Sequence, residues 1–258
     1  MGARGAVGRN AGVQKGVMKV WTFSLCRNEA GMLPFFLRHY EKFCTQINVW
    51  DDQSDDGSRE ILAAHPLVRL HDWEFDDGIS EDRFLEFAYN KYPTACGHAD
   101  WVIWPDLDEF IYHPHPLECL KQLDESGYRV CTTEGFNMCH DGLPKDDGRQ
   151  IWEIARLGVH ATVYSKPVIF KPTEIIRWNR GKHALESKHR LPPSPPFKLL
   201  HYRYLGREYT TMKNAKNYAR CGLKSGDKGA AWTCAPDYHG EHSADWAEQI
   251  MSFAKEVV

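Results

Sequence analysis

The sequence lacks any apolar stretch close to the roughly 20 residues that a membrane-spanning helix needs, so it predicts no transmembrane segment. No apolar core follows the basic residues Arg4, Arg9 and Lys15 near its start, which disfavours a secretory signal. Its charge is nearly balanced, because 35 acidic and 32 basic residues leave a formal net charge of −3. That balance gives no reason to expect nucleic acid or an anionic membrane as a partner.

Cysteine is present, but not in the spacing of a zinc site. None of the eight cysteines forms a Cys-x-x-Cys pair, which disfavours a structural zinc ion. Several cysteines lie in apolar, strand-like segments, where a free thiol behaves as a small hydrophobic group. We therefore expect reduced cysteines and a cytoplasmic location.

Two common phosphate-binding motifs are also missing. No Gly-x-Gly-x-x-Gly follows the first predicted strand, which disfavours a dinucleotide-binding fold. No Gly-x-x-x-x-Gly-Lys-Ser/Thr occurs anywhere, which excludes a P-loop. We expect any bound diphosphate to depend on a metal ion instead.

The first half of the chain predicts alternating strands and helices. Short runs rich in β-branched and aromatic residues predict strands at 19–26, 47–50, 68–71 and 101–104. Apolar residues at helical spacing predict helices that begin near Pro34 and at 58–64 and 81–92. This alternation predicts an α/β fold with a mostly parallel central sheet flanked by helices on both faces.

The second half has a more mixed pattern. We expect strands at 128–133, 166–171 and 197–202, and helices at 208–221 and 245–256. Irregular chain is expected at the polar segment 139–149 and at the proline-rich segment 191–196. The residues before Met18 have no periodicity and predict a disordered leader at 1–17.

The most informative segment is the apolar run from Trp101 that leads into Asp106, Asp108 and Glu109. Asp106 and Asp108 are two residues apart, so in extended backbone their side chains point the same way. Two carboxylates so placed can hold Mg²⁺ or Mn²⁺, which a phosphate would share. A bare Asp-x-Asp is more often a solvated strand end. Glu109 should alternate away from both aspartates and act as structural support.

Two other predicted strands end in polar clusters, Arg27-Asn28-Glu29 and the segment from Asp51 to Gly57. In a parallel sheet all three ends meet at one edge, where open α/β sheets place their ligand crevices. A carboxylate there can bind a base or ribose, backbone amides can meet phosphate, and a metal can bridge a diphosphate. The convergence therefore favours a nucleotide site over three unrelated strand ends.

These segments resemble family 2 glycosyltransferases with a GT-A fold, in the branch whose motif is Asp-x-Asp-Glu-Phe. The specific resemblance covers about residues 19–112, through Cys-Arg27-Asn28-Glu29, Val-Trp-Asp51-Asp52-Gln-Ser54 and Trp101 to Phe110. It is looser from 166 to 206, through Lys166-Pro-Val-Ile-Phe-Lys, Gly181-Lys-His183 and His201-Tyr-Arg203. The chain departs from the family in the turn after the second strand, where Asp52-Gln53 replaces the usual Asn-Gly and leaves the geometry of that turn open.

The resemblance implies transfer of a sugar from a UDP-, GDP- or dTDP-sugar donor to an acceptor that the sequence does not identify, whether a glycan, a lipid-linked group or another molecule. It implies that Asp51 binds the base or ribose, that Asp106 approaches the ribose or metal, and that Asp108 ligates Mn²⁺ or Mg²⁺. A late histidine would complete the metal site, with His201 as the first choice and His183 as the second. The other implied donor-binding residues are Arg27, Asn28, Glu29 and Ser54.

An inverting transfer also needs a carboxylate base that takes the acceptor's proton. We expect this base in the loop after strand 128–133, with Asp141 as the first candidate. The further candidates are Glu134, Asp146, Asp147 and Glu153. The alternative for each is a turn-forming acid in a solvent loop.

A basic face is predicted near the end of the chain. If 208–224 is helical, Lys213, Lys216, Arg220 and Lys224 share one side of the helix. Such a face is usually solvated, and the functional alternative is a basic rim for the donor diphosphate or an anionic acceptor.

The resemblance implies a GT-A catalytic domain at 18–206, with a nucleotide-binding half at 18–112 and an acceptor half at 113–206, followed by a helical extension at 207–258. Two other functions stay open. A nucleotidyltransferase also holds Mg²⁺ at a sheet edge, but it would need a Gly-rich basic loop where Arg27-Asn28-Glu29 stands. A non-catalytic sugar-nucleotide-binding protein is the second alternative, since a fold does not determine its function.

Overall fold

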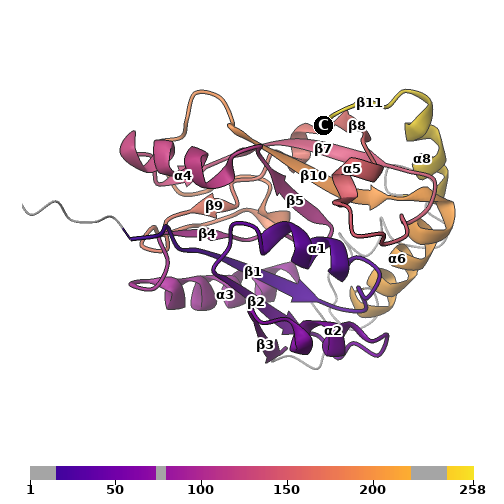
Figure 1. The fold of residues 1–258 in the computed structure, drawn as a ribbon, viewed down its shortest axis with the longest axis horizontal. Coiled ribbons are helices and arrows are strands. Elements are labelled where there is room, and N and C mark those ends of the chain that lie inside the picture. The colour runs from indigo at the N-terminus through magenta and orange to yellow at the C-terminus, as the bar shows by residue number, and fades with distance from the viewer. Residues whose placement is uncertain (1–15, 74–79, 222–242) are drawn as a thin grey trace, which may run out of the picture.

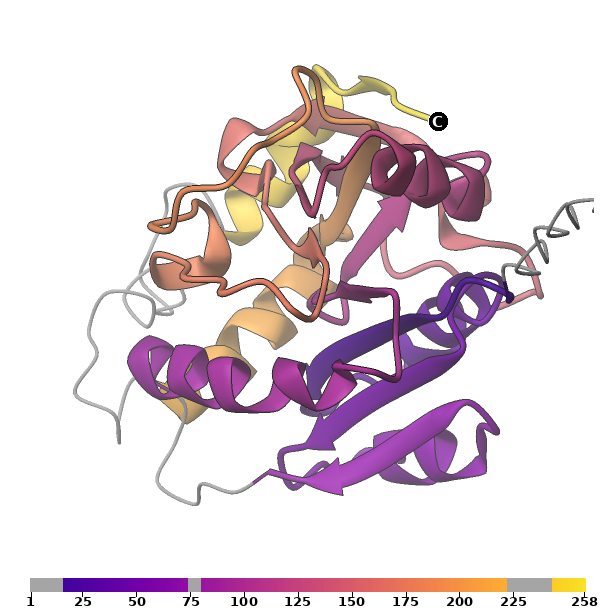
Figure 2. The same ribbon diagram turned by 90° about the vertical axis from the view of Figure 1, so that its left-hand side faces the viewer.

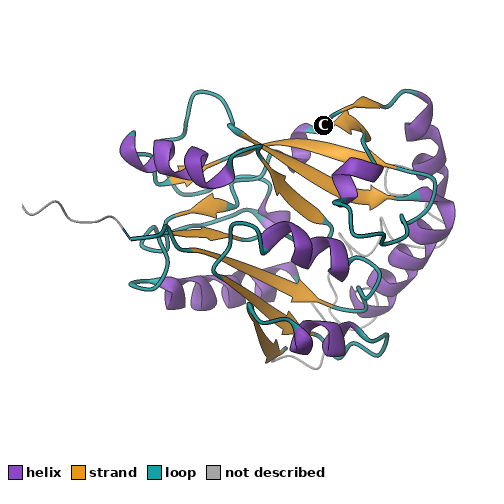
Figure 3. Cartoon of the chain, in the orientation of Figure 1, coloured by secondary structure: helices purple, strands orange, loops and turns teal. Residues whose placement is uncertain are grey.

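The computed structural model describes residues 16–73, 80–221 and 243–258, which form two neighbouring β-sheets with helices packed around them (Figure 1). The strands run through the middle of the molecule and the helices lie mainly on its outside (Figure 3). Within these residues, no helix is both long enough and apolar enough to cross a membrane.

The first sheet has six strands in the order β3-β2-β1-β4-β9-β6. They are β1 (Val20–Cys26), β2 (Gln46–Asp51), β3 (Val68–Asp72), β4 (Trp101–Ile103), β6 (Val130–Cys131) and β9 (Ile169–Phe170). The first four strands in the chain run parallel, whereas β9 is antiparallel to both of its neighbours. The loops that follow β1 and β2 therefore leave the sheet at the same edge.

Helices cover both faces of this parallel half. α1 (Leu33–Tyr40) and α2 (Ser58–Ala64) lie on one side of the strands, and α3 (Glu81–Lys91) lies on the other (Figure 2). Because strand side chains alternate, β2 directs Ile47 and Val49 into the core beneath α1, and Trp50 into the core beneath α3. The predicted α/β architecture is confirmed in this half of the chain.

The second sheet has the strand order β11-β8-β7-β10-β5. Its strands are β5 (Glu109–Tyr112), β7 (Thr133–Cys139), β8 (Leu157–His160), β10 (Phe197–Tyr204) and β11 (Lys255–Glu256). β7 and β10 are parallel, and the other pairs are antiparallel. The chain passes directly from one sheet to the other, since β4 ends at Ile103 and β5 begins at Glu109.

Four further helices lie around these sheets. They are α4 (Pro116–Glu125), α5 (Ile151–Ile154), α6 (Gly206–Cys221) and α8 (Ala244–Gln249). Single 3₁₀ turns occur at η1 (Tyr92–Ala95), η2 (Thr162–Tyr164), η3 (Arg180–Lys182) and η4 (Ile250–Ser252). α6 follows β10 and runs past the side toward which the β1 arrow points, so it borders the carboxyl edge of the first sheet (Figure 1).

Most predicted elements are confirmed within one to four residues. The predicted strand 128–133 and the loop expected after it are wrong, because β6 ends at Cys131 and Thr133–Cys139 forms β7 of the second sheet. The sequence did not predict α4, and two further features differ. The sequence did not indicate a second sheet, because its short strands are identified only by their pairing with distant segments. The predicted helix at 245–256 is wrong in its second half: the helix stops at Gln249, and Lys255 and Glu256 pair with β8. The predicted leader lies almost wholly outside the described residues.

Candidate functional site

The Asp-x-Asp motif lies in the turn by which the chain crosses between the two sheets. The Glu109 amide donates to the Asp106 carbonyl over 2.9 Å, and the Glu109 carboxylate accepts from the Asp106 amide over 3.1 Å. The expectation of extended backbone at Asp106 and Asp108 is therefore wrong, because the chain has to reverse here to enter β5. Glu109 is fully buried and holds this turn, as its predicted supporting role requires.

A cavity of about 370 Å³ opens beside the turn, at the carboxyl edge of β1 and β4. Segments from both halves of the chain and from α6 line it. Its basic lining side chains are Arg27, Lys166, Lys182, Arg203 and Lys213, and its acidic ones are Glu29, Glu81, Asp106 and Asp108. His183 and His201 complete the ionisable lining. The cavity thus brings together six predicted donor-binding or metal-binding residues, Arg27, Glu29, Asp106, Asp108, His183 and His201, and Lys213 of the predicted basic face.

Asp106 faces two lysines from the segment after β7. Its Oδ1 is 2.6 Å from Lys182 Nζ, and its Oδ2 is 3.3 Å from Lys166 Nζ. Lys166 Nζ also lies 2.5 Å from Glu109 Oε1, so one ammonium joins the turn's two carboxylates. Burial would raise the pKa of Asp106, but the two ammonium groups outweigh it and hold that pKa well below its usual range.

Lys182 reaches Asp106 from a strained backbone. Its φ is +60°, in the left-handed region that non-glycine residues rarely adopt. The side chain is nevertheless buried, with Nζ 3.4 Å from the Trp104 carbonyl and 5.2 Å from the centre of the Phe84 ring. Strain of this kind costs of order 1 kcal/mol and persists where surrounding contacts require it, which here means the ion pair with Asp106.

Asp108 belongs to a different cluster. Its Oδ2 lies 2.6 Å from Lys213 Nζ and 3.7 Å from His201 Nε2, and Lys213 Nζ also lies 3.2 Å from Glu29 Oε1. Burial alone would raise the pKa of Asp108, but Lys213 and then His201 outweigh it and keep that pKa well below its usual range. Burial raises the pKa of Glu29, which Lys213 only partly offsets. One buried ammonium therefore bridges carboxylates from β1's loop and from the turn.

Strand pairing fixes His201 beside Asp108. His201 pairs with Glu109 across β10 and β5, and the amide of its neighbour Tyr202 donates to the Asp108 carbonyl over 2.7 Å. Its ring stacks on Tyr164 with centroids 4.0 Å apart, and its Nδ1 is 3.0 Å from Asn137 Oδ1. Burial lowers the pKa of His201 to about 3, so the imidazole is neutral near pH 7.

The loops after β1 and β2 use their polar side chains mainly on each other. Asn28 donates from Nδ2 to Asp55 Oδ1 over 2.7 Å and accepts from the Asp55 amide at 2.8 Å, while Ser54 Oγ accepts from the Asn28 amide at 2.8 Å. The Glu29 amide donates to Ser58 Oγ over 2.8 Å. Asn28 and Ser54, expected to bind the donor, therefore hold two strand ends together and do not line the cavity.

Asp51 closes β2 as a buried carboxylate with one satisfied oxygen. Oδ2 accepts from the Ser54 amide at 3.2 Å and lies 3.3 Å from the Arg59 guanidinium. Among the described residues, no hydrogen-bond partner reaches Oδ1, which is itself buried. A buried acceptor of this kind costs about 1–3 kcal/mol unless a donor group meets it. Asp51 lies next to Cys26 of β1 in the sheet, one residue before the cavity-lining Arg27.

The turn where Asp52-Gln53 replaces Asn-Gly keeps a conformation that glycine favours. Gln53 has a φ of +54°, in the left-handed region. Glycine would adopt this conformation without strain, so Gln53 holds it at the cost of local strain.

The predicted metal ligands lie in one cavity without forming a ready ligand set. Asp106 is paired with Lys166 and Lys182, and Asp108 is paired with Lys213. Across 16–73, 80–221 and 243–258, no group of three or more His, Cys, Asp or Glu side chains is arranged to hold a metal ion. The second-choice ligand His183 bonds to the Val163 carbonyl through Nδ1 at 2.6 Å, and burial lowers its pKa.

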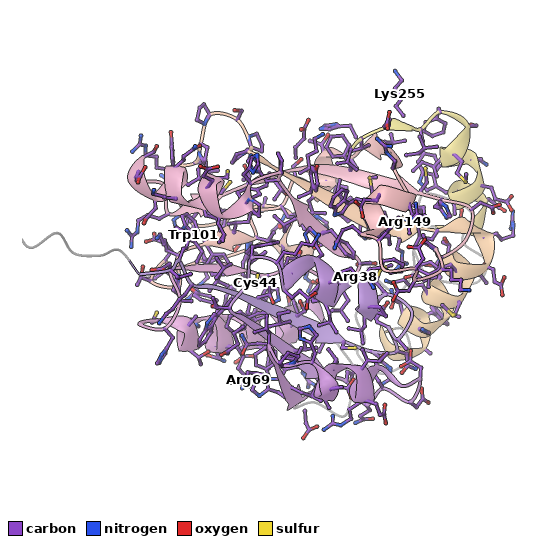
Figure 4. All side chains as sticks on the ribbon, viewed as in Figure 1. Arg38, Cys44, Arg69, Trp101, Arg149 and Lys255 are labelled. Carbon is purple, nitrogen blue, oxygen red and sulfur yellow. The ribbon has the colours of Figure 1, made fainter. Side chains whose placement is uncertain are left out.

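The candidate bases lie elsewhere. Asp141 is exposed in the loop after β7, and within the described chain neither it nor Glu134, Asp146, Asp147 or Glu153 lines the cavity. Asp146 pairs with Arg38 over 2.6 Å, and Arg38 also donates to the Arg149 carbonyl over 2.6 Å, which ties this loop to α1 (Figure 4). Of the four carboxylates that line the cavity, Glu81 at the start of α3 lies outside the pairs made by Lys166, Lys182 and Lys213, and it accepts from the Gly181 amide at 3.0 Å.

Several residues that line the cavity have no role predicted from the sequence, chiefly Glu81, Tyr164, Lys166, Lys182 and Arg203. Lys166, Lys182 and Arg203 stand inside the looser family segments, so a charged residue in those segments was the available signal. On the predicted basic face, Lys213 enters the cavity and Lys216 Nζ donates to the Asn28 carbonyl over 2.6 Å. Lys224 and the side chain of Arg220 lie outside the described residues.

Comparison with known proteins gives limited similarity. No protein-family model matches the chain, and no curated protein matches its sequence. Among solved structures, TarS of S. aureus is similar over 84% of this chain and 42% of the TarS chain, at 12% identity and a TM-score of 0.47. TarS 1–349 in complex with UDP-GlcNAc is similar over 84% of this chain and 70% of the TarS chain, at 12% identity and a TM-score of 0.44. This chain spans less than half of the length of the first TarS chain.

Proposed function

We propose that this protein is a glycosyltransferase that takes a sugar from a nucleotide-sugar donor. The observation that carries the proposal is the charged cavity at the carboxyl edge of a parallel sheet, where the Asp-x-Asp-Glu-Phe turn faces buried lysines. Cleavage of a sugar–phosphate bond leaves a nucleoside diphosphate with added negative charge. Fixed cations in a half-closed cavity stabilise that charge in the transition state.

The donor's base or ribose is assigned to Asp51. Its buried Oδ1 needs a donor group, and a base N–H or a ribose hydroxyl is one. The diphosphate would lie beside Arg27, Lys166 and Lys213, the basic residues that line the cavity. This arrangement uses the sheet edge in the way that open α/β folds bind nucleotides.

The donor site is tested by thermal shift with UDP-, GDP- and dTDP-sugars, each with Mn²⁺ and with EDTA, followed by assay of nucleoside diphosphate release. One nucleotide class should raise the melting temperature. Asp108→Asn should abolish release, whereas Asp147→Asn, which changes an exposed acid paired with Arg149, should leave it within about twofold of wild type. If no nucleotide sugar shifts the melting temperature, the proposal fails.

The same assay separates the alternatives. Release of pyrophosphate from a nucleoside triphosphate would identify a nucleotidyltransferase. Donor stabilisation without any release, in the presence of varied acceptors, would identify a binding protein. The cavity's cations and the neighbouring Asp51 would serve nucleotide binding in all three cases, so the product that is released decides between them.

Two carboxylates are candidates for the base that takes the proton of the acceptor hydroxyl. Asp141 stays the candidate from family likeness, and Glu81 is the candidate from position in the cavity. A base has to lie within hydrogen-bond reach of the acceptor hydroxyl. We expect Glu81→Gln to lower kcat by about 100-fold or more with donor binding retained, and Asp141→Asn to lower it only if the loop approaches the bound donor.

A further inference from the structure

We propose that Lys213 is a built-in counter-cation that occupies the position between Asp108 and Glu29 where a divalent ion would otherwise bind. In this protein the ammonium replaces the expected metal, and donor binding does not require Mn²⁺ or Mg²⁺. The statement about the donor rests on the proposed function. The statement about the metal position rests only on the residues of the cavity.

The first support is the contact geometry of Lys213. Its Nζ lies 2.6 Å from Asp108 Oδ2 and 3.2 Å from Glu29 Oε1, and the side chain is only 9% exposed. Two buried carboxylates from different segments thus converge on one cationic centre. Removing the ammonium while leaving the carboxylates would leave buried negative charge without compensation, which is strongly unfavourable.

The second support is the orientation of His201. Asn137 Oδ1 can only accept a hydrogen bond, so His201 Nδ1 carries the proton and Nε2 carries the lone pair. That lone pair lies 3.7 Å from Asp108 Oδ2. With ligand bonds of about 2.1 Å, two ligand atoms of one ion can be up to about 4.2 Å apart, so both atoms could reach one ion. Asp108 Oδ2 and His201 Nε2 are therefore close enough to contact one ion, although with Lys213 in place the described His, Cys, Asp and Glu side chains form no group of three arranged to hold a metal.

The third support is how firmly α6 places the ammonium. Lys216, three residues on, donates to the Asn28 carbonyl over 2.6 Å, and Asn214 bonds to the Arg203 guanidinium. Thr210 donates to the Arg203 carbonyl over 3.3 Å, which joins the helix to β10. Lys213 is thus held by the fold and does not enter the cavity from a free surface.

Charge balance gives the reason for such a replacement. The cavity lining contains five basic residues and four acidic residues, so its cations already exceed its carboxylates before a diphosphate enters. A divalent ion next to the Lys213 ammonium would be repelled by about 8 kcal/mol at 4 Å and an effective dielectric constant of 20. Metal and ammonium therefore compete for one position.

The test measures Mn²⁺ binding alone, by electron paramagnetic resonance of free Mn²⁺ during titration with MnCl₂. Wild type should bind weakly, and Lys213→Met should bind at least about tenfold more tightly, since the repulsion is gone and Asp108 and Glu29 have lost their cationic partner. Lys213→Met with Asp108→Asn should lose the gain. Lys121→Met, which removes an exposed ammonium on α4, should stay within about twofold of wild type.

Folding of the variant gives a second readout. Lys213→Met should unfold at lower urea than wild type, and MnCl₂ should restore much of the midpoint in this variant but not in wild type. UDP should raise the melting temperature of wild type equally in EDTA and in Mn²⁺. Tight Mn²⁺ binding by wild type, or no gain in Lys213→Met, overturns the proposal whatever the donor turns out to be. Failure of UDP, GDP and dTDP alike in both media, with the metal results intact, would instead overturn the donor assignment.

Discussion

Two groups of polar residues, the strand-end loops after β1 and β2 and the cavity wall around Asp106 and Asp108, are held in place by different interactions. In the strand-end loops after β1 and β2, Asn28 and Ser54 bond to backbone groups or to neighbours within the loops. In the cavity wall, Asp106 and Asp108 each face a buried lysine from a distant segment. Both regions carry the motifs of the resemblance, yet Asn28 and Ser54 stay outside the cavity, whereas both aspartates line it.

The difference shows what a polar strand end can be used for. A neutral side chain that satisfies a backbone amide stabilises the fold by about 1 kcal/mol and is then no longer available to a ligand. A buried ion pair stabilises little in net terms, because desolvation offsets its attraction, but it keeps charges in fixed positions. The ion pairs of the cavity wall therefore add little to stability but hold charges in position for a ligand. The hydrogen bonds of the loops stabilise the strand ends beside them.

Removal of one buried cation should have the largest effect on stability. Lys166→Met leaves the fully buried Glu109 without its partner at 2.5 Å, so we expect a loss of about 3–5 kcal/mol in the free energy of unfolding near pH 8. Ser54→Ala in the loops should cost only about 1 kcal/mol. Urea denaturation of both variants measures the contrast.

A double variant separates charge from packing in this result. Burial already raises the pKa of Glu109, and loss of Lys166 should raise it further. Glu109→Gln combined with Lys166→Met should therefore recover part of the lost stability, whereas a pure packing defect would leave the double variant as unstable as the single one. Equal costs for Lys166→Met and Ser54→Ala would remove the distinction between the two regions.

Acid sensitivity should come from the core before it comes from the cavity aspartates. Burial lowers the pKa of His39 from 6.5 to about 4, so between these values the unfolded chain binds a proton that the folded chain does not. Stability is then lost as pH falls, by about 1.4 kcal/mol per pH unit for His39. Asp106 and Asp108 have lowered pKa values, so their contribution is present above about pH 4 and is lost only below it.

Denaturation across pH 4.5 to 6.5 measures this order of events. His39→Gln should flatten the dependence of stability on pH by about 1.4 kcal/mol per unit, while Asp106→Asn should leave the slope unchanged in that range. His201, with its pKa lowered to about 3 by burial, keeps a slope of the same sign in both variants. A flatter slope in Asp106→Asn would mean that the cavity wall titrates near neutrality, against the ion pairs described for it.

The sequence predicted the parallel half of the fold well because that half is local in its signals. Strands, helices and the polar ends of β1 and β2 follow from periodicity within a few residues. Lys182 and Lys213 could not be placed in the same way, since their positions depend on segments 76 and more than 100 residues from Asp106 and Asp108. The turn at Asp106 could not be predicted from the local sequence, because the chain reverses there only to place β5 beside β10 in the second sheet.

The smallest expected effect concerns backbone strain in the loops. Gln53 and Asn28 both have positive φ, at +54° and +52°. Gln53→Gly should raise the free energy of unfolding by about 0.5–1 kcal/mol, because glycine adopts this conformation without steric cost. Asn28→Gly should lower it instead, because it deletes the two bonds between the Asn28 side chain and Asp55. Opposite signs in urea denaturation would show that relief of backbone strain decides the result at Gln53 and that loss of side-chain bonds decides it at Asn28. The same sign at both positions would mean that one of these effects outweighs the other at both.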